Sequence, residues 1–273
     1  PCQTVDLRSA SSPTVGAVPL LSVVVPATDA PPTLGRCVAA IRGADDPPDE
    51  LIVVEDPGLS TSRCTPMRSG ACAELTALFG SYDDEAARNH GARRASGDVV
   101  VFVDADVEVH PDAFRRLRQA FGADAELTAL FGSYDDEPGD PGLVSAFRNL
   151  LHHHVHQSSG GPAETFWTGL GAVRRAAFLA TGGFDEVRYP DPSIEDIELG
   201  HRLRSGGSSV RLDPSIQGKH LKVWTLRSML WTDLFRRGVP WVALQLRTRR
   251  VARSLNCGWR HRLSAVACAS LVL

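Results

Sequence analysis

The chain has 273 residues, 43% of them hydrophobic and 22% charged, which is enough to bury a large core and excludes a mainly disordered protein. The net charge of −3 hides a strong asymmetry: residues 1–199 hold 15 Lys and Arg against 30 Asp and Glu, whereas residues 200–262 hold 14 against 2. A basic part of this kind suits nucleic acid or anionic lipid headgroups.

Residues 1–19 show no periodicity and are expected to form a loose leader. Apolar runs rich in β-branched residues then alternate with segments of helical spacing, which is typical of buried parallel strands connected by helices. Acidic residues come directly after the second and third runs. This predicts an open α/β sheet whose ligands bind beyond the carboxyl ends of the strands. The predicted strands are 20–25, 51–54 and 99–103, and the predicted helices are 33–43, 85–95 and 111–120.

The segment AELTALFGSYDDE occurs twice without change, at 73–85 and at 125–137. The chain shows no solenoid period, so a repeat fold is excluded. The second copy supplies an expected strand at 127–131. The first copy falls where the fold needs only a short connection, so we interpret it as a duplication or a sequence-assembly error, and we expect it to pack poorly and to contribute no site.

The six cysteines form no CxxC pair, and a zinc site is not expected. Cys64 and Cys72 could bridge if oxidised, but scattered thiols without a signal peptide favour a reducing compartment.

From residue 221 onward, apolar residues and tryptophans recur at helical spacing, with arginines interspersed. Such an amphipathic, basic segment suits a membrane interface, although an ordinary core-packing helix has the same stripe. The uncharged residues 263–273 are too few to span a bilayer, and they suit the first half of a transmembrane helix in a longer parent chain. The mixture of Trp and Leu with Arg argues against nucleic acid as the partner.

Asp104 and Asp106 come directly after the predicted strand 99–103. Two carboxylates one residue apart at a strand end can both face the ligand crevice and hold a hard divalent cation. Such a cation would neutralise a diphosphate and stabilise it as a leaving group.

Five segments, taken in this order, resemble the GT-A, family 2 glycosyltransferases from about residue 20 to residue 241. They are LSVVVPATDAPPTLGRCVAAI, ELIVVEDPG, AARNHGARRASGDVVVFVDADV, TGLGAVRRAAFLATGGFDE and SIEDIELGHRLRSGG. The resemblance implies a GT-A fold: an open mixed sheet flanked by helices, with a membrane-proximal helical segment after it. It also implies a nucleotide-diphosphate sugar, for which we expect UDP, as donor, with Mn²⁺ or Mg²⁺ as cofactor.

The resemblance also assigns donor-binding residues by position. The segment after the first strand would lie along the base and ribose, although PATD replaces the usual PTYN-like sequence there. Asp56 would read the base edge, although Pro57-Gly58 replaces the usual Gly-Ser. The expected donor-binding residues are Pro26, Ala27, Asp29, Asp56, Arg88, Asp104, Ala105 and Asp106.

Asp196, in the ED motif, would be the general base that takes the proton of the acceptor hydroxyl in an inverting transfer. Glu195 could bind the acceptor or raise the pKa of Asp196 through like-charge proximity. An ordinary helix start with acids in its first turn is the structural alternative.

The resemblance further implies His220 as a third metal ligand beside Asp104 and Asp106. The residues Trp167, Thr168 and Gly169 precede the GGFDE turn and are expected to line the acceptor pocket. Four histidines between 152 and 156 look like a metal cluster, but adjacent histidines on a helix point in different directions, so a metal role is not expected.

The sequence therefore predicts an inverting, metal-dependent glycosyltransferase acting on a lipid-linked or cell-envelope glycan at the cytoplasmic face of a bacterial-type membrane. The expected parts are a leader (1–19), a GT-A domain (20–220, with a nucleotide-binding half 20–122 and an acceptor-binding half 123–220) and a membrane-proximal segment (221–273). A catalytically degenerate scaffold is the alternative. A sugar-phosphate nucleotidyltransferase is disfavoured, because residues 26–32 contain no glycine or basic residue.

Overall fold

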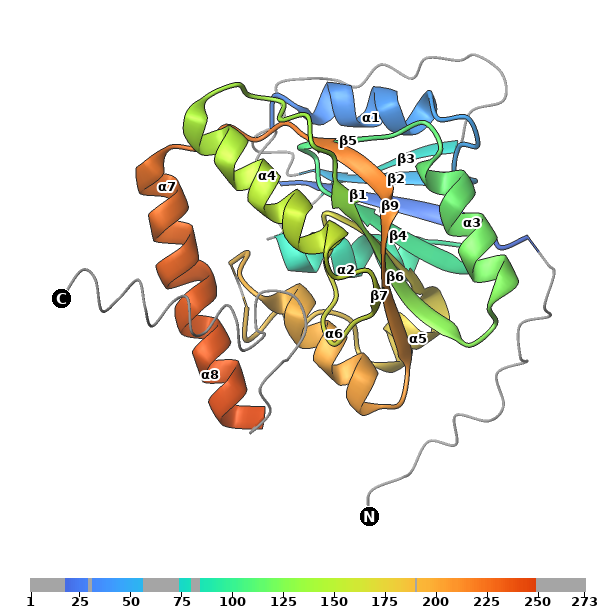
Figure 1. Ribbon diagram of the computed structural model, residues 1–273. Coiled ribbons are helices and arrows are strands. Elements are labelled where there is room, and N and C mark those ends of the chain that lie inside the picture. The colour runs from blue at the N-terminus through green and yellow to red at the C-terminus, as the bar shows by residue number, and fades with distance from the viewer. Residues whose placement is uncertain (1–17, 29–30, 56–73, 80–83, 190, 249–273) are drawn as a thin grey trace.

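The computed structural model describes residues 18–28, 31–55, 74–79, 84–189 and 191–248, and one mixed sheet runs through them (Figure 1). The strand order is β3-β2-β1-β4-β8-β6-β9-β5, with β7 also paired to β9. Strands β1–β4 pair in parallel, and β8 lies antiparallel between β4 and β6. The expected mixed α/β sheet is therefore confirmed. The strands are β1 Leu21–Ala27, β2 Glu50–Glu55, β3 Glu74–Phe79, β4 Val99–Val103, β5 Val107–Val109, β6 Leu127–Tyr134, β7 Gly161–Pro162, β8 Leu170–Arg174 and β9 Ser209–His220.

Helices cover both faces of the sheet, so its central strands are buried on both sides. On one face α1 and α3 contribute residues such as Ile41 and Phe114 to the first core, and on the other face α2, α5 and α6 contribute residues such as Phe178 and Leu199 to the second core. Complete burial of β1 and β4 explains why their sequences are apolar at every position or nearly so. The helices are α1 Leu34–Arg42, α2 Asp84–Arg94, α3 Ala113–Ala123, α4 Leu143–Gln157, α5 Arg175–Ala180 and α6 Glu195–Ser205.

The predicted strands 20–25, 51–54 and 99–103 are confirmed as β1, β2 and β4, and the three predicted helices as α1, α2 and α3. The expectation of a short connection at 73–85 was wrong. The first copy of the repeated segment forms β3, which extends the sheet by pairing in parallel with β2 over six residues. Leu78 from this strand packs, partly buried, against the second core.

A long helical stretch comes after the sheet, made of α7 Leu226–Trp231, the π-helical turn η2 Thr232–Gly238 and α8 Val239–Thr248. Figure 1 shows it standing beside the sheet, next to α4. It is fixed there by a bidentate ion pair of Arg148 with Asp233, at 2.7 and 2.8 Å. Ser145 on α4 also accepts a 2.7 Å hydrogen bond from the backbone N–H of Trp224.

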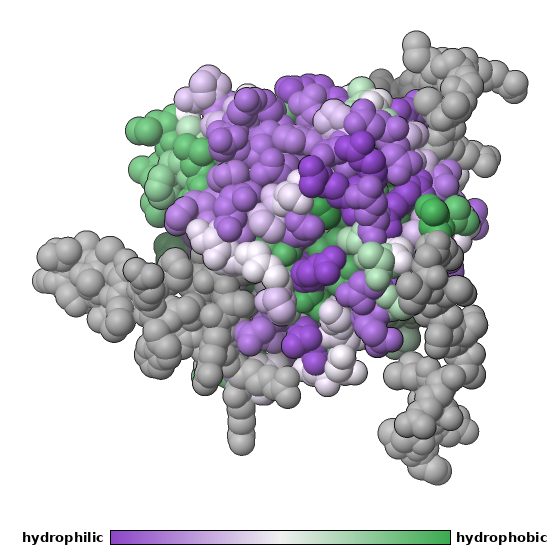
Figure 2. Space-filling model, turned by 45° about the vertical axis from the view of Figure 1, so that its right-hand side comes forward, coloured by the Kyte–Doolittle hydropathy of each residue, from purple (hydrophilic) through white to green (hydrophobic). Residues whose placement is uncertain are grey.

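This helical stretch and the neighbouring α4 expose many large apolar side chains, the apolar rim. Figure 2 shows hydrophobic residues gathered at the upper left edge of an otherwise mostly hydrophilic face, on the side where Figure 1 places α4 and α7. Within the described part of the chain, no helix has the length and apolar character needed to cross a bilayer. Residues 263–273 lie outside the described residues. The apolar rim consists of Leu143, Phe147, Leu150 and Leu151 on α4 and Leu226, Leu230, Trp231, Leu234, Phe235, Val239, Val242 and Leu246 on the C-terminal helices.

Candidate active site

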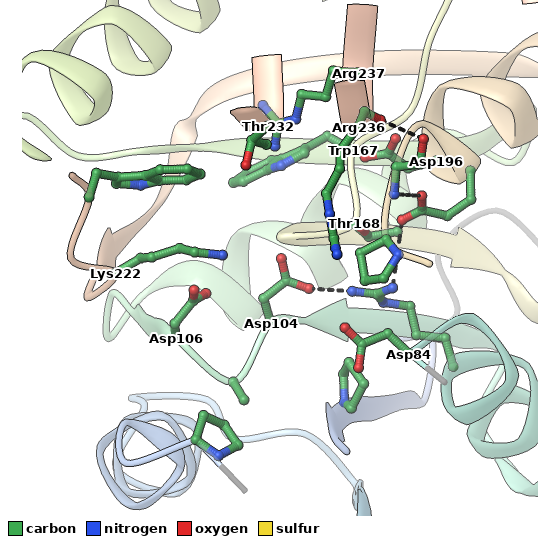
Figure 3. Close-up of a pocket in the computed structure, with 18 residues that line it drawn as sticks. Asp84, Asp104, Asp106, Trp167, Thr168, Asp196, Lys222, Thr232, Arg236 and Arg237 are labelled. Atoms are coloured by element: carbon green, nitrogen blue, oxygen red, sulfur yellow. Dashed lines mark hydrogen bonds and ion pairs between the residues drawn. The ribbon is translucent and has the colours of Figure 1, made fainter. Parts of the chain in front are cut away.

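A cavity of about 330 Å³ lies at the carboxyl ends of β1 and β4, where an open α/β sheet binds its ligands (Figure 3). Acidic and basic side chains both line it, and three of the four cations come from the C-terminal segment. The acids are Asp84, Asp104, Asp106, Glu195 and Asp196, and the cations are Arg88, Lys222, Arg236 and Arg237.

Asp104 and Asp106 leave β4 in the turn before β5, as expected from the sequence. Strand β5 pairs antiparallel with the end of β9, so that Val107 lies opposite His220. This pairing brings His220 Nε2 to 3.7 Å from Asp106 Oδ2. The His220 ring also stacks on Tyr134, with centroids 4.2 Å apart, which orients it. Burial would raise the pKa of Asp106, but His220 and Lys222 outweigh it, and the pKa is lowered.

Among the described residues, no three His, Cys, Asp or Glu side chains converge as a complete metal site. Asp106 and His220 supply an oxygen and a nitrogen ligand side by side, and Asp104 is turned toward Arg88 instead. A divalent cation fits here if a bound diphosphate supplies further oxygen ligands, because Mg²⁺ and Mn²⁺ are held by few carboxylates together with substrate phosphates.

Arg88 on α2 is the buried cation that joins the acids of the site. It donates a 2.8 Å hydrogen bond to Asp104 Oδ1 and lies 3.4 Å from Glu85 and 3.7 Å from Glu195. Burial alone would lower the pKa of Arg88, but the surrounding carboxylates raise it, so the guanidinium stays charged. Burial and the nearby Glu195 raise the pKa of Glu85 to about 9, which leaves this carboxyl protonated at neutral pH.

Glu195 and Asp196 begin α6 on the far side of the cavity. Glu195 accepts a 2.8 Å hydrogen bond from the Ser193 N–H, which ties it to the segment before the helix, while its other oxygen faces Arg88. Asp196 Oδ1 accepts from the Ile197 N–H at 2.7 Å. Burial and the neighbouring Glu195 raise the pKa of Asp196 to about 7, against the opposing charge of Arg237. The helix-start alternative and the base hypothesis therefore describe the same residues.

The GGFDE turn connects α2 to α6 and so sets the distance between the two halves of the site. Asn89 on α2 donates to the Phe184 carbonyl and accepts from the Phe184 N–H, both at 2.9 Å. Arg202 on α6 donates to the Gly183 carbonyl at 2.6 Å. Gly183 has φ +71°, and a Cβ there would lie 2.3 Å from Asn89 Oδ1, so the position requires glycine.

Of the expected acceptor residues, Trp167 and Thr168 line the cavity. Gly169 is not among the lining residues; a Cβ there would lie 2.2 Å from the Trp167 ring, so this glycine allows the tryptophan to fold back over it. The Trp167 ring contacts Tyr134 edge-on at 4.8 Å between centroids. Because His220 stacks on the same tyrosine, the metal-ligand candidate and the acceptor candidate share one aromatic support.

Of the expected donor residues, Pro26, Arg88 and Ala105 line the cavity with the two aspartates. Ala27 is not among the lining residues: it is 2% exposed, and its methyl group packs in the first core, so its part in donor binding stays a prediction. Asp29 and Asp56 lie outside the described residues. Next to Asp29 in the chain, Thr28 donates a hydrogen bond to Asp84.

Sequence reasoning missed five charged residues of this site. Asp84 lines the cavity and Glu85 contacts Arg88, so the expectation that the first repeated copy contributes no site was wrong. The signal was their position immediately before the AARN segment. Arg236 and Arg237 were interpreted as the polar side of a membrane helix, and Lys222 was given no role. All three extend toward the acids from the opposite side of the cavity (Figure 3).

The four histidines of α4 are divided between its faces. His153 Nδ1 lies 2.8 Å from the Tyr134 carbonyl and His156 Nδ1 lies 3.0 Å from the Gly132 carbonyl, so both hold α4 against β6. The His152 ring contacts the Trp167 ring at a tilt of 55°, with centroids 4.8 Å apart. His154 is exposed.

The sequence model of glycosyl transferase family 2 matches residues 22–181 of the chain. Validoxylamine A glucosyltransferase of Streptomyces hygroscopicus subsp. limoneus is 27% identical over 222 residues, covering 70% of this chain and 49% of that protein. The protein of the same name from subsp. jinggangensis (strain 5008) is 26% identical over 222 residues, covering 70% and 52%. The chain thus spans about half the length of these curated relatives.

Three solved structures share the fold. A mannosyltransferase from Pyrobaculum calidifontis, in complex with GDP-Man and Mn²⁺, has a TM-score of 0.54 at 22% identity, covering 77% of this chain and 59% of that one. GalNAc-T7 with UDP, GalNAc and Mn²⁺ has a TM-score of 0.54 at 15% identity, covering 74% of this chain and 44% of that one. S. aureus TarS 1–349 has a TM-score of 0.50 at 16% identity, covering 73% of this chain and 59% of that one. At these identities the likeness shows the GT-A fold alone.

Proposed function

Because the chain belongs to glycosyltransferase family 2, we propose that it is an inverting, metal-dependent transferase that moves a sugar from a nucleoside-diphosphate donor, a UDP-sugar, to a lipid-linked or cell-envelope glycan. The carrying observation is the arrangement across one cavity: Asp104 and Asp106 at the end of β4, and Asp196, with its raised pKa, at the start of α6. Perturbed carboxylates that converge in a cleft are the pattern of a catalytic site.

The donor's diphosphate would lie between Asp106 and the cations of the C-terminal segment. Lys222, Arg236 and Arg237 have no acidic partner within salt-bridge distance among the described residues, so their charges are available to an anionic ligand. Arg88 is not available in this way, because Asp104, Glu85 and Glu195 surround it. A divalent cation at Asp106 and His220 would supply Lewis-acid stabilisation of the leaving diphosphate.

In the transfer step, an acceptor hydroxyl oxygen attacks C1 of the sugar. The new O–C1 bond forms as the bond from C1 to the diphosphate oxygen breaks, and that electron pair leaves with the diphosphate. Asp196 takes the hydroxyl proton. A carboxyl with a pKa of about 7 is well matched to this role near neutral pH, because it is partly ionised and still basic enough to accept a proton.

We place the protein at the cytoplasmic face of the membrane, and the apolar rim supports contact with a membrane surface. Leu230, Trp231 and Leu234 are each about half exposed or more, and neighbouring large apolar side chains that are exposed together mark an interaction surface. Arg227, which does not line the cavity, lies on the same helical stretch, and a helix with aromatic and basic residues suits the boundary of an anionic bilayer. Membrane placement in turn favours a lipid-linked acceptor.

A small soluble acceptor is a second candidate, supported by the names of the two Streptomyces relatives, which act on validoxylamine A. The two candidates share the donor site and differ in whether the apolar rim meets lipid. Vesicle binding therefore separates them.

Calorimetric titration with UDP and with GDP, with and without Mn²⁺, tests the shared proposal. We expect Mn²⁺-dependent binding of one nucleotide, abolished by Asp106→Ala and preserved in Asp112→Ala, an aspartate that pairs with Arg116 outside the cavity. Absence of binding for both nucleotides and for dTDP would favour the catalytically degenerate scaffold.

A further inference from the structure

A second cavity, of about 140 Å³, opens beside Asp196 on the side of α4 and α8. Trp167, Ser193, Asp196 and Arg237 line both this cavity and the larger one, so the two meet at the carboxylate of Asp196. We call it the ring cavity. Its remaining walls include His152 and His156 from α4, Thr165, Ile197 and Trp241.

Three polar atoms in the walls of the ring cavity have no hydrogen-bond partner among the described residues: Thr165 Oγ1, His152 Nε2 and Trp241 Nε1. Thr165 is only 2% exposed, so bulk water does not reach it freely. Buried polar groups are nearly always hydrogen-bonded in native proteins, and an unpaired one is destabilising. Three of them in one small cavity indicate that a ligand or ordered water completes their bonding.

The chemistry of these three atoms defines what would complete them. The indole N–H donates only, the threonine hydroxyl donates and accepts, and a neutral imidazole nitrogen does either according to tautomer. Burial lowers the pKa of His152 well below its ordinary value, so this ring is uncharged. A hydroxyl group both donates and accepts, so hydroxyl groups can bond to all three atoms. An ionised phosphate only accepts, so it cannot bond to His152 Nε2 in the tautomer in which this nitrogen is an acceptor.

The charged side chains of the ring cavity carry both signs. Arg148 is paired with Asp233, and Arg237 lines the cavity together with Asp196, so an uncharged ligand suits it. The Trp167 ring lines the wall between the two cavities and offers an apolar surface for the C–H face of a sugar or cyclitol ring.

We propose that the ring cavity binds the acceptor's terminal ring, an uncharged, hydroxyl-bearing sugar or cyclitol, with one hydroxyl on Asp196. This rests on the proposed function and deepens it, because it assigns Thr165, His152 and Trp241 to acceptor recognition. The donor then approaches Asp196 from the Asp104 side and the acceptor from the opposite side, as a displacement at C1 with inversion requires.

The test uses two neutral probes, methyl α-D-glucopyranoside and myo-inositol, titrated against the full chain with UDP and Mn²⁺ present and monitored by saturation-transfer NMR. Thr165→Val removes a hydroxyl group and keeps the shape, and Trp241→Phe removes the indole N–H and leaves a smaller aromatic ring. We expect each to weaken binding of a probe about tenfold. Thr128→Val is the matched control, because this threonine lies on β6 outside the cavity.

Circular dichroism melting establishes that the variants fold, and calorimetry with UDP and Mn²⁺ establishes that their donor site is intact. If neither probe binds the wild type, or if both variants bind as tightly as Thr128→Val, the inference is wrong, and the cavity holds water. If the wild type also fails to bind any nucleotide, the proposed function itself fails.

Discussion

Replacing Asp196 by Asn tests the proposed mechanism most directly. Asparagine keeps the size of the side chain and its hydrogen bond from the Ile197 N–H, but it cannot accept the proton of the acceptor hydroxyl. General-base catalysis contributes about 10²–10⁴-fold to such rates, so we expect a loss of that size in kcat. Nucleotide binding should remain, because the substitution removes a negative charge from a site that receives an anion.

The pH dependence gives an independent measure of the same residue. The carboxylate is the active form, so activity should fall as the pH drops through the pKa of about 7. With that pKa, the ionised fraction is roughly nine tenths at pH 8 and about one tenth at pH 6, and kcat/KM should track this fraction. In Asp196→Asn this fall in kcat/KM on the acidic side, the acidic limb of the pH profile, should be absent.

Glu195→Gln is the companion variant, because the charge of Glu195 is the main cause after burial that raises the pKa of Asp196. The amide oxygen can still accept from the Ser193 N–H. We therefore expect the limb to move to lower pH.

The assay is release of the nucleoside diphosphate from the donor, with an acceptor found by screening or with water as acceptor. An Asp196→Asn enzyme that keeps more than a tenth of wild-type activity, or a limb that does not move in Glu195→Gln, would refute the assignment of the base.

The fold around the site supports three further predictions. Arg237→Gln should weaken nucleotide binding about fivefold at low salt and less at high salt, whereas Arg227→Gln should not, as calorimetry at two ionic strengths will test. Leu230→Glu should reduce cosedimentation with anionic vesicles, since this side chain is 49% exposed on the apolar rim; unchanged cosedimentation would count against a membrane role for the rim. Gly183→Ala should destabilise the fold by about 1–3 kcal/mol, seen as a lower Tm, because the position combines positive φ with contact to Asn89.

The parts of the fold that could be predicted are those whose signal is local. Strand β4 is apolar at every position because helices cover both faces, and this pattern is visible without knowing which helices they are. Asp104 was found because it stands at the end of a strand, where chain order alone puts it near the crevice, whereas Glu195 was found through the resemblance of its segment to the family.

The parts that could not be predicted depend on long-range placement. Arg236 and Arg237 lie about 130 residues after Asp104 in the chain, and nothing in their local pattern distinguishes a helix that faces lipid from one that closes a cavity. In the structure η2 could do both: its Leu234 and Phe235 are exposed and could meet lipid, and its two arginines close the cavity opposite the acids. Some of the positive charge after residue 200 therefore lies opposite negative charge from the first part of the same chain.

The repeated segment shows the same limit in its sharpest form, because identical residues have different surroundings. Asp84 begins α2 and accepts a hydrogen bond from Thr28, whereas the equivalent Asp136 in the second copy is exposed. The residues immediately after each copy decide the difference: Ala-Ala-Arg-Asn continues into a helix, and Pro138-Gly139 prevents one.

Asp84→Ala and Asp136→Ala thus form a pair of variants matched in local sequence. Without the hydrogen bond from Thr28, the segment that comes after β1 and adjoins the cavity must be ordered when the nucleotide binds, at a cost of about 1 kcal/mol. We expect about fivefold weaker nucleotide binding for Asp84→Ala and no change for Asp136→Ala by calorimetry. Equal effects of the two substitutions would mean that the position of Asp84 beside the cavity has no part in binding.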